Sequence, residues 1–408
     1  MPDKLIVVLG ATGLQGGSVA RLYASLAGWR VRGITRDPEK VSCTPLREAG
    51  VELVAGDLDD PASLDRAFEG ANVVFAVTDF WQFIQLPPTH QKAAEQGREP
   101  NQVAMDLEIQ QGKNMIHAAA KHLSTLERLV VSTLSDSERW SGGKITSNLH
   151  FDGKAKYTQY LKDHFPDLAQ KSSYLQMGYY LSNWKSMPGM APKKQEDGTF
   201  VLMRSGGKHP TPYVDPPNDT GYLVKALVEA KEANITLLGY CELISNEEYA
   251  AIWGKVLGVK VRTEVKGMED AKAAGLPDFL IREVSESIAY VSAWGWDGGD
   301  PEVKHPRDVG VEMEKLTKVE EWIRRENWTD YHGDTSIETC VYRSRQKISQ
   351  ELSSRFGLAS HIFNGLITPE TLLKLYETRP TSSLVPDHWR RRLHINGLPQ
   401  ASQTSLAS

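Results

Sequence analysis

The fold of this chain is decided by one stretch near its start, Val7-Val8-Leu9-Gly10-Ala11-Thr12-Gly13-Leu14-Gln15-Gly16-Gly17-Ser18-Val19-Ala20. In this stretch a glycine turn joins an apolar strand to a helix. Gly10 permits the tight turn, Gly13 lets backbone approach a pyrophosphate, and Gly16 allows the helix to pack closely on the strand. Because the amide groups at a helix N-terminus attract anionic oxygens, this spacing predicts a dinucleotide-binding turn.

The composition is typical of an ordinary globular protein. The chain has 408 residues, a formal net charge of -5 and 40% hydrophobic residues, which is enough for one large core, or for a large and a smaller one. A mildly acidic balance gives no broad electrostatic footprint for nucleic acid. The sequence shows neither a signal peptide nor an apolar run that could span a bilayer, so we expect no membrane association and a cytoplasmic location.

The cysteines and the other potential ligands give no sign of a metal site. Cys43, Cys241 and Cys340 lie far apart and form no C-x-x-C pair, so the sequence suggests neither a disulfide framework nor a thiolate zinc site. There is also no His/Cys/carboxylate cluster with metal-ligand spacing, no nucleophile elbow and no P-loop lysine. We therefore expect no metal and a reducing compartment.

Strands and helices alternate along the first part of the chain, which predicts a parallel sheet with right-handed crossovers. The expected strands after the first cover residues 31–35, 51–55, 71–77, 129–132 and 173–176, and the clearest helices between them cover residues 61–68 and 102–122. Residues 83–100 are expected to form an irregular insertion. Residues 133–148 are expected to form a polar loop.

The end of the second expected strand indicates which cofactor binds. An acidic residue about 20 positions after the glycines would bind the ribose hydroxyls, whereas an arginine accommodates a 2′-phosphate. Arg36 stands at this place with Lys40 one turn later, which favours NADP(H) over NAD(H). Asp37, next to Arg36, leaves NAD(H) open.

Polar residues follow the next two strands, at the edge of the sheet where ligands bind. Asp57 is placed to reach the adenine, but Asp59 or Asp60 can equally open the following helix, and capping alone would explain this aspartate cluster. Thr78 and Asp79 follow the fourth strand and are either rim residues or part of the local packing.

A second informative stretch is His150-Phe151-Asp152-Gly153-Lys154-Ala155-Lys156-Tyr157. On a helix, His150 and Lys154 share one face, so an imidazole and an ammonium group face the same volume. A lysine can bind a nicotinamide ribose, and an imidazole can give or take a proton near neutral pH. A solvated helix end with a chance His/Lys pair is the alternative.

These residues belong to a wider pattern that resembles the NmrA-like family, an atypical branch of the short-chain dehydrogenase/reductase superfamily, and its NADPH-sensing members in particular. The matching stretches are residues 8–20, Thr35-Arg36-Asp37-Pro38, Gly56-Asp57-Leu58, Val77-Thr78-Asp79-Phe80-Trp81, His150-Phe151-Asp152-Gly153-Lys154, Tyr180-Leu181-Ser182-Asn183 and Pro212-Tyr213-Val214-Asp215. They cover the chain to about Trp328.

The resemblance implies an α/β protein with two domains. Residues 1–176 would form an NADP-binding Rossmann domain with a doubly wound parallel sheet. Residues 177–328 would form a smaller α+β substrate-type domain, some segments of which return to the Rossmann sheet. Residues 329–408 lie beyond the resemblance, and their own sequence predicts a C-terminal extension that is partly helical and disordered at its end.

The resemblance also assigns cofactor-binding positions. Thr12, Gly13, Leu14, Gln15 and Gly16 would wrap the pyrophosphate after the turn at Gly10, Arg36 would take the 2′-phosphate, Asp57 and Leu58 would flank the adenine, Thr78 would lie along the cofactor, Lys154 would hold the nicotinamide ribose, and Tyr180 and Asn183 would border the nicotinamide. The chain departs from the family pattern at one position, because the NADPH-sensing members carry a lysine where this chain has Gln110.

A second departure bears on catalysis. The superfamily uses Tyr-x-x-x-Lys, and His150 fills the tyrosine position, so Lys154 is expected to bind cofactor while His150 as acid/base is a hypothesis. The leading interpretation is an NADP(H)-dependent oxidoreductase acting on a small-molecule carbonyl or activated alkene. The alternative is a non-catalytic NADP(H)-binding sensor with a regulatory protein partner, for which the nucleus is a second location. Lysine-assisted reduction of an ether, with His150 dispensable, is a third.

Overall fold

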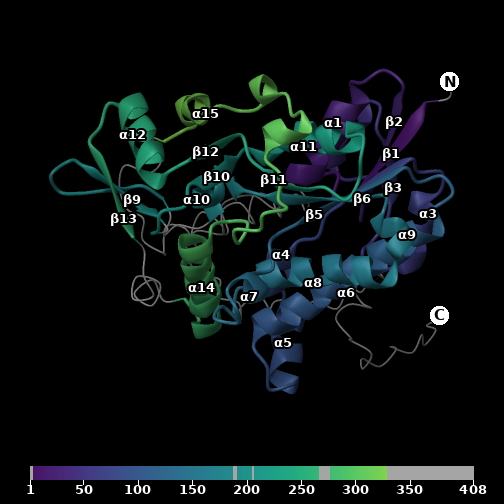
Figure 1. Cartoon of the computed structure of the whole chain (residues 1–408), viewed down its shortest axis with the longest axis horizontal. Helices are drawn as coiled ribbons and strands as arrows, with labels where there is room; N and C mark the ends of the chain where they lie inside the picture. The colour runs from purple at the N-terminus through teal and green to yellow at the C-terminus, as the bar shows by residue number, and fades with distance from the viewer. Residues whose placement is uncertain (1–2, 187–190, 205, 266–275, 329–408) are drawn as a thin grey trace, which may run out of the picture. The chain divides into compact units, whose positions relative to one another are not determined.

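The computed structural model describes residues 3–186, 191–204, 206–265 and 276–328, and a seven-stranded parallel sheet lies at its centre (Figure 1). The strand order is β11-β6-β5-β4-β1-β2-β3. This order reverses between β1 and β4, the place where such sheets bind ligands beyond the carboxyl ends of their strands. The strands are β1 (Lys4–Val8), β2 (Trp29–Thr35), β3 (Glu52–Ala55), β4 (Val73–Ala76), β5 (Arg128–Thr133), β6 (Ser172–Met177) and β11 (Thr236–Gly239).

Strand β1 explains why helices cover both faces of the sheet. Its apolar side chains are buried and alternate between two hydrophobic cores, with Ile6 and Val8 in one and Leu5 and Val7 in the other. A strand that is buried on both faces needs such a continuous apolar run. The first core is covered by α1 (Leu14–Ala24) and α11 (Pro216–Glu229), and the second by α3 (Pro61–Phe68), α6 (Pro100–Lys121) and α8 (Leu149–His164), as Figure 1 shows.

The chain after β6 builds two small sheets and further helices. One sheet has the order β12-β10-β7 and the other β13-β9-β8, and β11 returns to the large sheet beside β6. The elements are β7 (Tyr179–Tyr180), α10 (Asn183–Ser186), β8 (Lys193–Lys194), β9 (Phe200–Arg204), β10 (Thr211–Val214), β12 (Glu242–Ile244), α12 (Asn246–Leu257), β13 (Val261–Val265), α14 (Asp278–Trp294) and α15 (Val319–Arg325). The α/β class is as expected.

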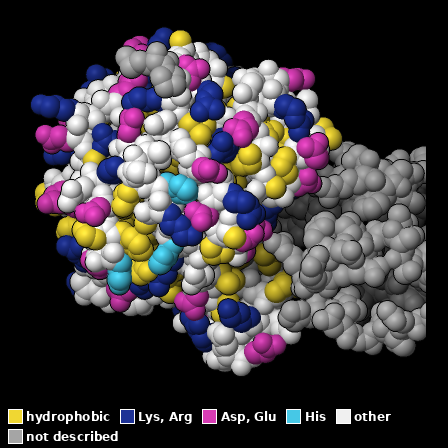
Figure 2. All heavy atoms as spheres, turned by 90° about the vertical axis from the view of Figure 1, so that its right-hand side faces the viewer, with side chains coloured by type: hydrophobic (Ala, Val, Ile, Leu, Met, Phe, Trp, Pro, Cys, Tyr) yellow, Lys and Arg dark blue, Asp and Glu magenta, His cyan; other side chains and the backbone are white. Residues whose placement is uncertain are grey.

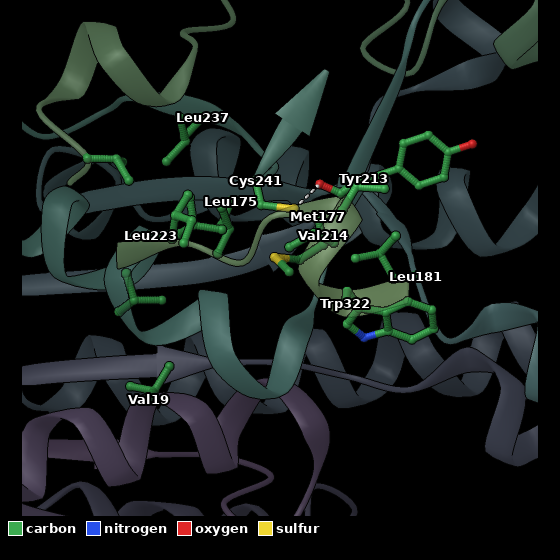
Figure 3. Close-up of a cluster of buried hydrophobic side chains, with 14 of the residues drawn as sticks. Val19, Leu175, Met177, Leu181, Tyr213, Val214, Leu223, Leu237, Cys241 and Trp322 are labelled. Carbon is green, nitrogen blue, oxygen red and sulfur yellow. Dashed lines mark hydrogen bonds between the residues drawn. The ribbon is translucent and has the colours of Figure 1, made fainter. Parts of the chain in front are cut away.

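The large sheet and these later elements share hydrophobic packing. Figure 3 shows Val19 of α1, Leu175 of β6 and Trp322 of α15 within one cluster of buried side chains. In the same cluster the Cys241 thiol donates to the Tyr213 carbonyl at 3.1 Å. Continuous apolar packing of this kind holds the later elements against the sheet.

Local signals explain where several elements begin. Asp60 caps α3 by accepting a hydrogen bond from the Ala62 amide at 3.1 Å, which settles which of the two neighbouring aspartates opens this helix. A capping box formed by Ser245 and Glu248 opens α12.

The expected irregular insertion at residues 83–100 is wrong, because two helices occupy most of it. Helix α4 (Phe80–Ile84) is capped by the Asp79 carboxylate, and α5 (Pro87–Glu95) begins with proline. Only Thr89 and Ala93 are buried in α5, so its sequence has too few apolar positions to show a helical period. The expected polar loop also contains a short helix, α7 (Ser137–Trp140), capped by Asp136.

The remaining short elements are η1 (Val41–Cys43), α2 (Thr44–Glu48), α9 (Pro166–Ala169), η3 (Pro306–Val309) and η4 (Met313–Lys315). The expected extension, residues 329–408, lies outside the described residues.

Within the described ranges, no helix is both long and apolar enough to cross a membrane. Figure 2 shows Lys and Arg side chains interspersed with Asp and Glu on the face that it presents.

Candidate active site

The turn between β1 and α1 forms a cradle of backbone. Gly10 has φ +60°, and a Cβ on Gly16 would lie 2.3 Å from the Gly10 carbonyl oxygen, so a side chain at residue 16 would collide with the turn. Gly13 is the N-cap of α1, and no acidic side chain lies in the first turn of this helix. The first amides of α1 are therefore left for an external acceptor, and a phosphate group fits this arrangement.

The side chains that follow Gly10 in the cradle differ in direction: some are exposed, and one forms hydrogen bonds inside the protein. Thr12 and Leu14 are exposed, and Leu14 keeps 51% of its surface accessible. Gln15 instead turns inward, where its Nε2 donates to the Tyr180 hydroxyl at 2.7 Å and its Oε1 accepts from the Ser132 hydroxyl at 2.8 Å. Gln15 thus joins the cradle to the carboxyl end of β5 and to β7.

Tyr180 lies at this junction, and the resemblance predicts that it borders the nicotinamide. Burial raises the pKa of Tyr180 to about 12, with the Gln15 hydrogen bond opposing this and the nearby Asp79 adding to it. The Tyr180 hydroxyl is therefore neutral at physiological pH.

The residues expected to select the cofactor lie after β2. Arg36 is exposed, and its guanidinium has no hydrogen-bond or ion-pair partner in the part of the chain that the structure describes. The Asp37 carboxylate accepts from the Glu39 amide at 3.1 Å and so stabilises the local turn. Arg47 contacts the Pro38 carbonyl at 2.8 Å and lies 3.8 Å from Glu39. Of the two arginines between β2 and β3, Arg36 is thus the one that has no partner in the described ranges and remains open to an added phosphate.

The expected adenine residues follow β3 at the neighbouring position of the same edge. Asp57 and Leu58 are both half-buried. Asp57 accepts a hydrogen bond from the Asp59 amide at 3.1 Å, and the Leu58 carbonyl accepts from Asn114 at 2.8 Å. The first bond is local to the loop after β3, and the second holds this loop against α6.

Lys154 on α8 forms a buried ion pair that the sequence did not reveal. Its ammonium group donates to Glu108 of α6, whose side chain is fully buried, while the Lys154 side chain is 13% exposed. The same Glu108 Oε1 accepts from the Thr78 hydroxyl at 2.7 Å, and Lys154 lies 3.4 Å from Thr78 Oγ1. Lys154 and Thr78, both expected at the cofactor, are therefore in direct contact.

Tyr157 extends this cluster to β5. Its hydroxyl donates to the Ser132 carbonyl at 2.9 Å and lies 3.2 Å from Thr78 Oγ1. Burial, followed by the charge of Glu108, raises the pKa of Tyr157 above its ordinary value. Close packing of α6 on α8 makes these contacts possible, because a Cβ on Gly112 would lie 2.3 Å from the Tyr157 ring.

His150, one turn before Lys154, has a buried carboxylate partner of its own. Its backbone amide and its Nδ1 lie 3.0 Å and 2.7 Å from the same Oε1 of Glu283 on α14. The other Glu283 oxygen accepts from the Asn101 side chain at 3.0 Å. The later part of the chain thus supplies a residue to the helix that carries His150 and Lys154.

Aromatic rings surround His150. The rings of Trp81 and Phe151 both lie 4.9 Å from its ring, centroid to centroid, and Phe80 lies at 6.0 Å. Trp296 packs on Phe151 at 5.4 Å and donates its indole N–H to the Met177 carbonyl at the end of β6. Three aromatic rings and the Glu283 carboxylate therefore contact the His150 side chain.

Direct contacts join two pairs of the predicted site residues, Gln15 with Tyr180 and Thr78 with Lys154. Arg36 and Asp57 follow adjacent strands at the same edge, and Asn183 opens α10. Gln110 is exposed and bonds to Asn114 at 2.9 Å. Glu108 and Glu283 were missed. The sequence feature that could have identified these two glutamates is an acidic residue on the buried face of a helix.

No group of three or more His, Cys, Asp or Glu side chains in the described ranges could hold a metal ion.

The glycine cradle and the seven-stranded sheet define a Rossmann-type protein. Within that class, the pattern of the NmrA-like family matches residues 2–323. The chain belongs to the NmrA-like family.

Among curated relatives, the chain is 29% identical over 232 residues to the NmrA-like family domain-containing oxidoreductase notA of Aspergillus sp. (strain MF297-2). That match covers 55% of this chain and 63% of notA. The chain is also 25% identical over 332 residues to the NmrA-like family domain-containing oxidoreductase FrzB of Cladobotryum sp, covering 77% of this chain and 91% of FrzB.

Solved structures with the same fold include NmrA, a negative transcriptional regulator, in complex with NADP. It has a TM-score of 0.58 and 20% identity, covering 80% of this chain and 95% of NmrA. Isoflavone reductase has a TM-score of 0.56 and 15% identity, covering 79% of this chain and 99% of that protein. At these identities the likeness concerns the fold alone.

Proposed function

We propose that this protein is an NADP(H)-dependent oxidoreductase that reduces a small-molecule carbonyl compound or activated alkene. One observation carries the proposal: a hydrogen-bond path connects the cradle to Lys154. It runs from Gln15 to Ser132, from the Ser132 carbonyl to Tyr157, and from Tyr157 through Thr78 to Lys154. This path supports the interpretation that the phosphate cradle and Lys154 serve one cofactor.

Each residue has a role in this proposal. The cradle from Gly10 to Gly16 binds the pyrophosphate, Arg36 binds the 2′-phosphate by a charge-assisted hydrogen bond, and Lys154 binds the nicotinamide ribose. The bound cofactor supplies hydride. His150 gives a proton to the substrate oxygen, and the aromatic rings around it exclude water from the reacting atoms.

A cofactor-binding sensor that acts through a regulatory protein is the second candidate, and Glu108 supports it. The buried carboxylate compensates the charge of Lys154, which reduces the field that this lysine exerts on a neighbouring acid. The replacement of the superfamily's tyrosine by His150 also supports the sensor. In the third candidate, reduction of an ether by lysine assistance, His150 has no role.

The deciding experiment combines calorimetry with a turnover screen. NADPH and NADP⁺ are titrated into the full chain, and NADPH oxidation is then followed by absorbance across aldehydes, ketones, quinones and enones, with Lys154→Ala as the control. Oxidation in proportion to added substrate supports the oxidoreductase. Binding of both forms with different affinities and no turnover supports the sensor. If His150→Ala leaves turnover on an identified substrate unchanged, His150 is not the acid.

A further inference from the structure

We propose that Glu283 is the positioning residue for His150, and that the two side chains form a dyad in which the histidine exchanges its proton with substrate through Nε2. The inference rests on the proposed function, in which His150 gives a proton to the reduced substrate. His150 and Glu283 are 133 residues apart in the chain, and α14 brings the carboxylate to α8.

The hydrogen bonds define where the imidazole proton lies. A carboxylate accepts hydrogen bonds and does not donate them, so the 2.7 Å contact between Glu283 Oε1 and His150 Nδ1 places a proton on Nδ1. The His150 amide also donates to this oxygen, and Asn101 donates to the other. Three donors therefore hold the carboxylate in one orientation.

Burial makes His150 the charge partner of Glu283. The Glu283 side chain is 0% exposed, and a carboxylate in that environment needs a compensating positive charge. The neighbouring Arg282 pairs with Glu99 instead. Within the described ranges, His150 is the cationic group that lies within ion-pair distance of Glu283. Glu283 thus pairs with His150 rather than with its neighbour Arg282.

The second ring nitrogen is left for substrate. His150 is 14% exposed, and in the part of the chain that the structure describes its Nε2 has no hydrogen-bond partner. Trp81 packs against the ring at 4.9 Å and limits its rotation. The imidazole is therefore fixed on its Nδ1 side and available on its Nε2 side.

For a carbonyl substrate, the proposed step transfers one hydride to the carbon and one proton to the oxygen. The carbonyl carbon receives a hydride from the reduced cofactor, and the electron pair of the C=O π bond moves to oxygen. The N–H bond at His150 Nε2 breaks, its proton forms the new O–H bond, and its electrons stay on the ring. The imidazole is left neutral with its proton on Nδ1, and solvent returns a proton to Nε2.

The chain offers a matched control on the same helix. Glu286, one turn after Glu283, accepts from the backbone amides of Thr146 and Ser147 at 2.6 Å and 2.7 Å. It anchors the segment before α8 in the same way but does not contact the imidazole. A purely structural role for Glu283 predicts the same effects from both glutamates.

The first test is nitrogen NMR on the full chain labelled with ¹⁵N-histidine, in which His150→Asn identifies the His150 signals. The neutral ring is expected to carry its proton on Nδ1 in the wild type, in Glu286→Ala and in Glu283→Gln, which keeps an oxygen acceptor. In Glu283→Ala the proton is expected to move towards Nε2. A wild-type ring protonated on Nε2, or an unchanged spectrum in Glu283→Ala, overturns the proposal. Because the wild-type spectrum alone shows which ring nitrogen carries the proton, it tests the proposal even if Glu283→Ala does not fold.

The second test separates this proposal from the proposed function. With a carbonyl substrate from the screen, Glu283→Ala is expected to lower kcat about 100-fold or more, the usual scale of acid–base catalysis, while Glu286→Ala stays near wild type. NADPH affinity is expected to be unchanged in both. An unchanged kcat in Glu283→Ala overturns the dyad. If wild-type protein does not bind NADPH, the proposed function fails, whatever the spectrum of His150 shows.

Discussion

Lys154 and Glu108 form an ion pair beneath the carboxyl edge of the sheet, with the carboxylate fully buried and the ammonium group 13% exposed. Such a pair contributes little net stability, because taking both charges out of water offsets their attraction. Removal of one partner is different, since it leaves the other charge buried without compensation. This asymmetry allows the structural role of Lys154 to be measured separately from its proposed role in cofactor binding.

We expect Lys154→Met to lower the free energy of unfolding by about 3–5 kcal/mol, because Glu108 keeps a buried charge without a partner. The double variant Lys154→Met/Glu108→Gln should regain most of this stability, since the amide can still accept from Thr78. NADPH affinity should stay low in both variants. Urea unfolding and calorimetry measure the two effects. A double variant that binds NADPH like the wild type would show that Lys154 does not contact the cofactor.

Arg36→Ala tests the choice of cofactor. A hydrogen bond between charged groups contributes about 1.5–3 kcal/mol, so NADPH affinity should fall roughly 10- to 100-fold while NADH affinity changes little. Arg47→Ala is the matched control, because this arginine follows the same strand but is already engaged with Pro38. Titration of both cofactors into both variants gives the comparison. Equal losses for NADPH and NADH, or a loss in Arg47→Ala as large as in Arg36→Ala, would assign the 2′-phosphate to another side chain.

The sheet and the cradle could be predicted because their signals are local. The run of apolar residues in β1, the glycine spacing after it and the Asp60 cap each lie within a few residues of the structure that they determine. The helix α8 with His150 and Lys154 on it was equally accessible. Helix α4 was missed because it has only 5 residues, and α5 was missed because it buries few side chains and therefore lacks an apolar period.

The partners of the two candidate catalytic residues could not be predicted from local signals. Glu108 is 46 residues from Lys154, and Glu283 is 133 residues from His150. Each acid lies on a helix whose position is set by tertiary packing, as the close approach of Tyr157 to Gly112 illustrates. A single sequence shows that a buried acid needs a partner but does not say which residue provides it.

Gly16→Ala tests the cradle as a backbone structure. The added methyl group would lie 2.3 Å from the Gly10 carbonyl, so the turn must shift, at a cost of about 2 kcal/mol or more in stability, with weaker NADPH binding. Gly17→Ala is the control, since its Cβ would lie 3.0 Å from the end of the Arg21 side chain and 3.2 Å from the Ala11 carbonyl oxygen, a much smaller overlap than at Gly16, and alanine has the better helix propensity. The free energies of unfolding of both variants, measured by chemical denaturation, test this prediction. Equal stabilities would mean that the turn is not held in the observed geometry.

Asp152, between His150 and Lys154 on α8, predicts a pH dependence of stability. Burial raises the pKa of its carboxyl group above the ordinary 3.8, although hydrogen bonds from Ser137 and Glu138 oppose this. The folded state therefore binds the proton more tightly than the unfolded state, and the contribution of this residue to stability falls as pH rises from about 3.8 through the raised pKa. Asp152→Asn keeps an oxygen for the Ser137 amide, at 2.8 Å in the wild type, but does not titrate. The variant should thus become more stable relative to the wild type as pH rises from 4 to 7, as measured by urea unfolding at several pH values in that window. A stability difference that stays constant, or that changes in the opposite direction, would mean that the Asp152 carboxylate is better stabilised in the fold than its burial implies.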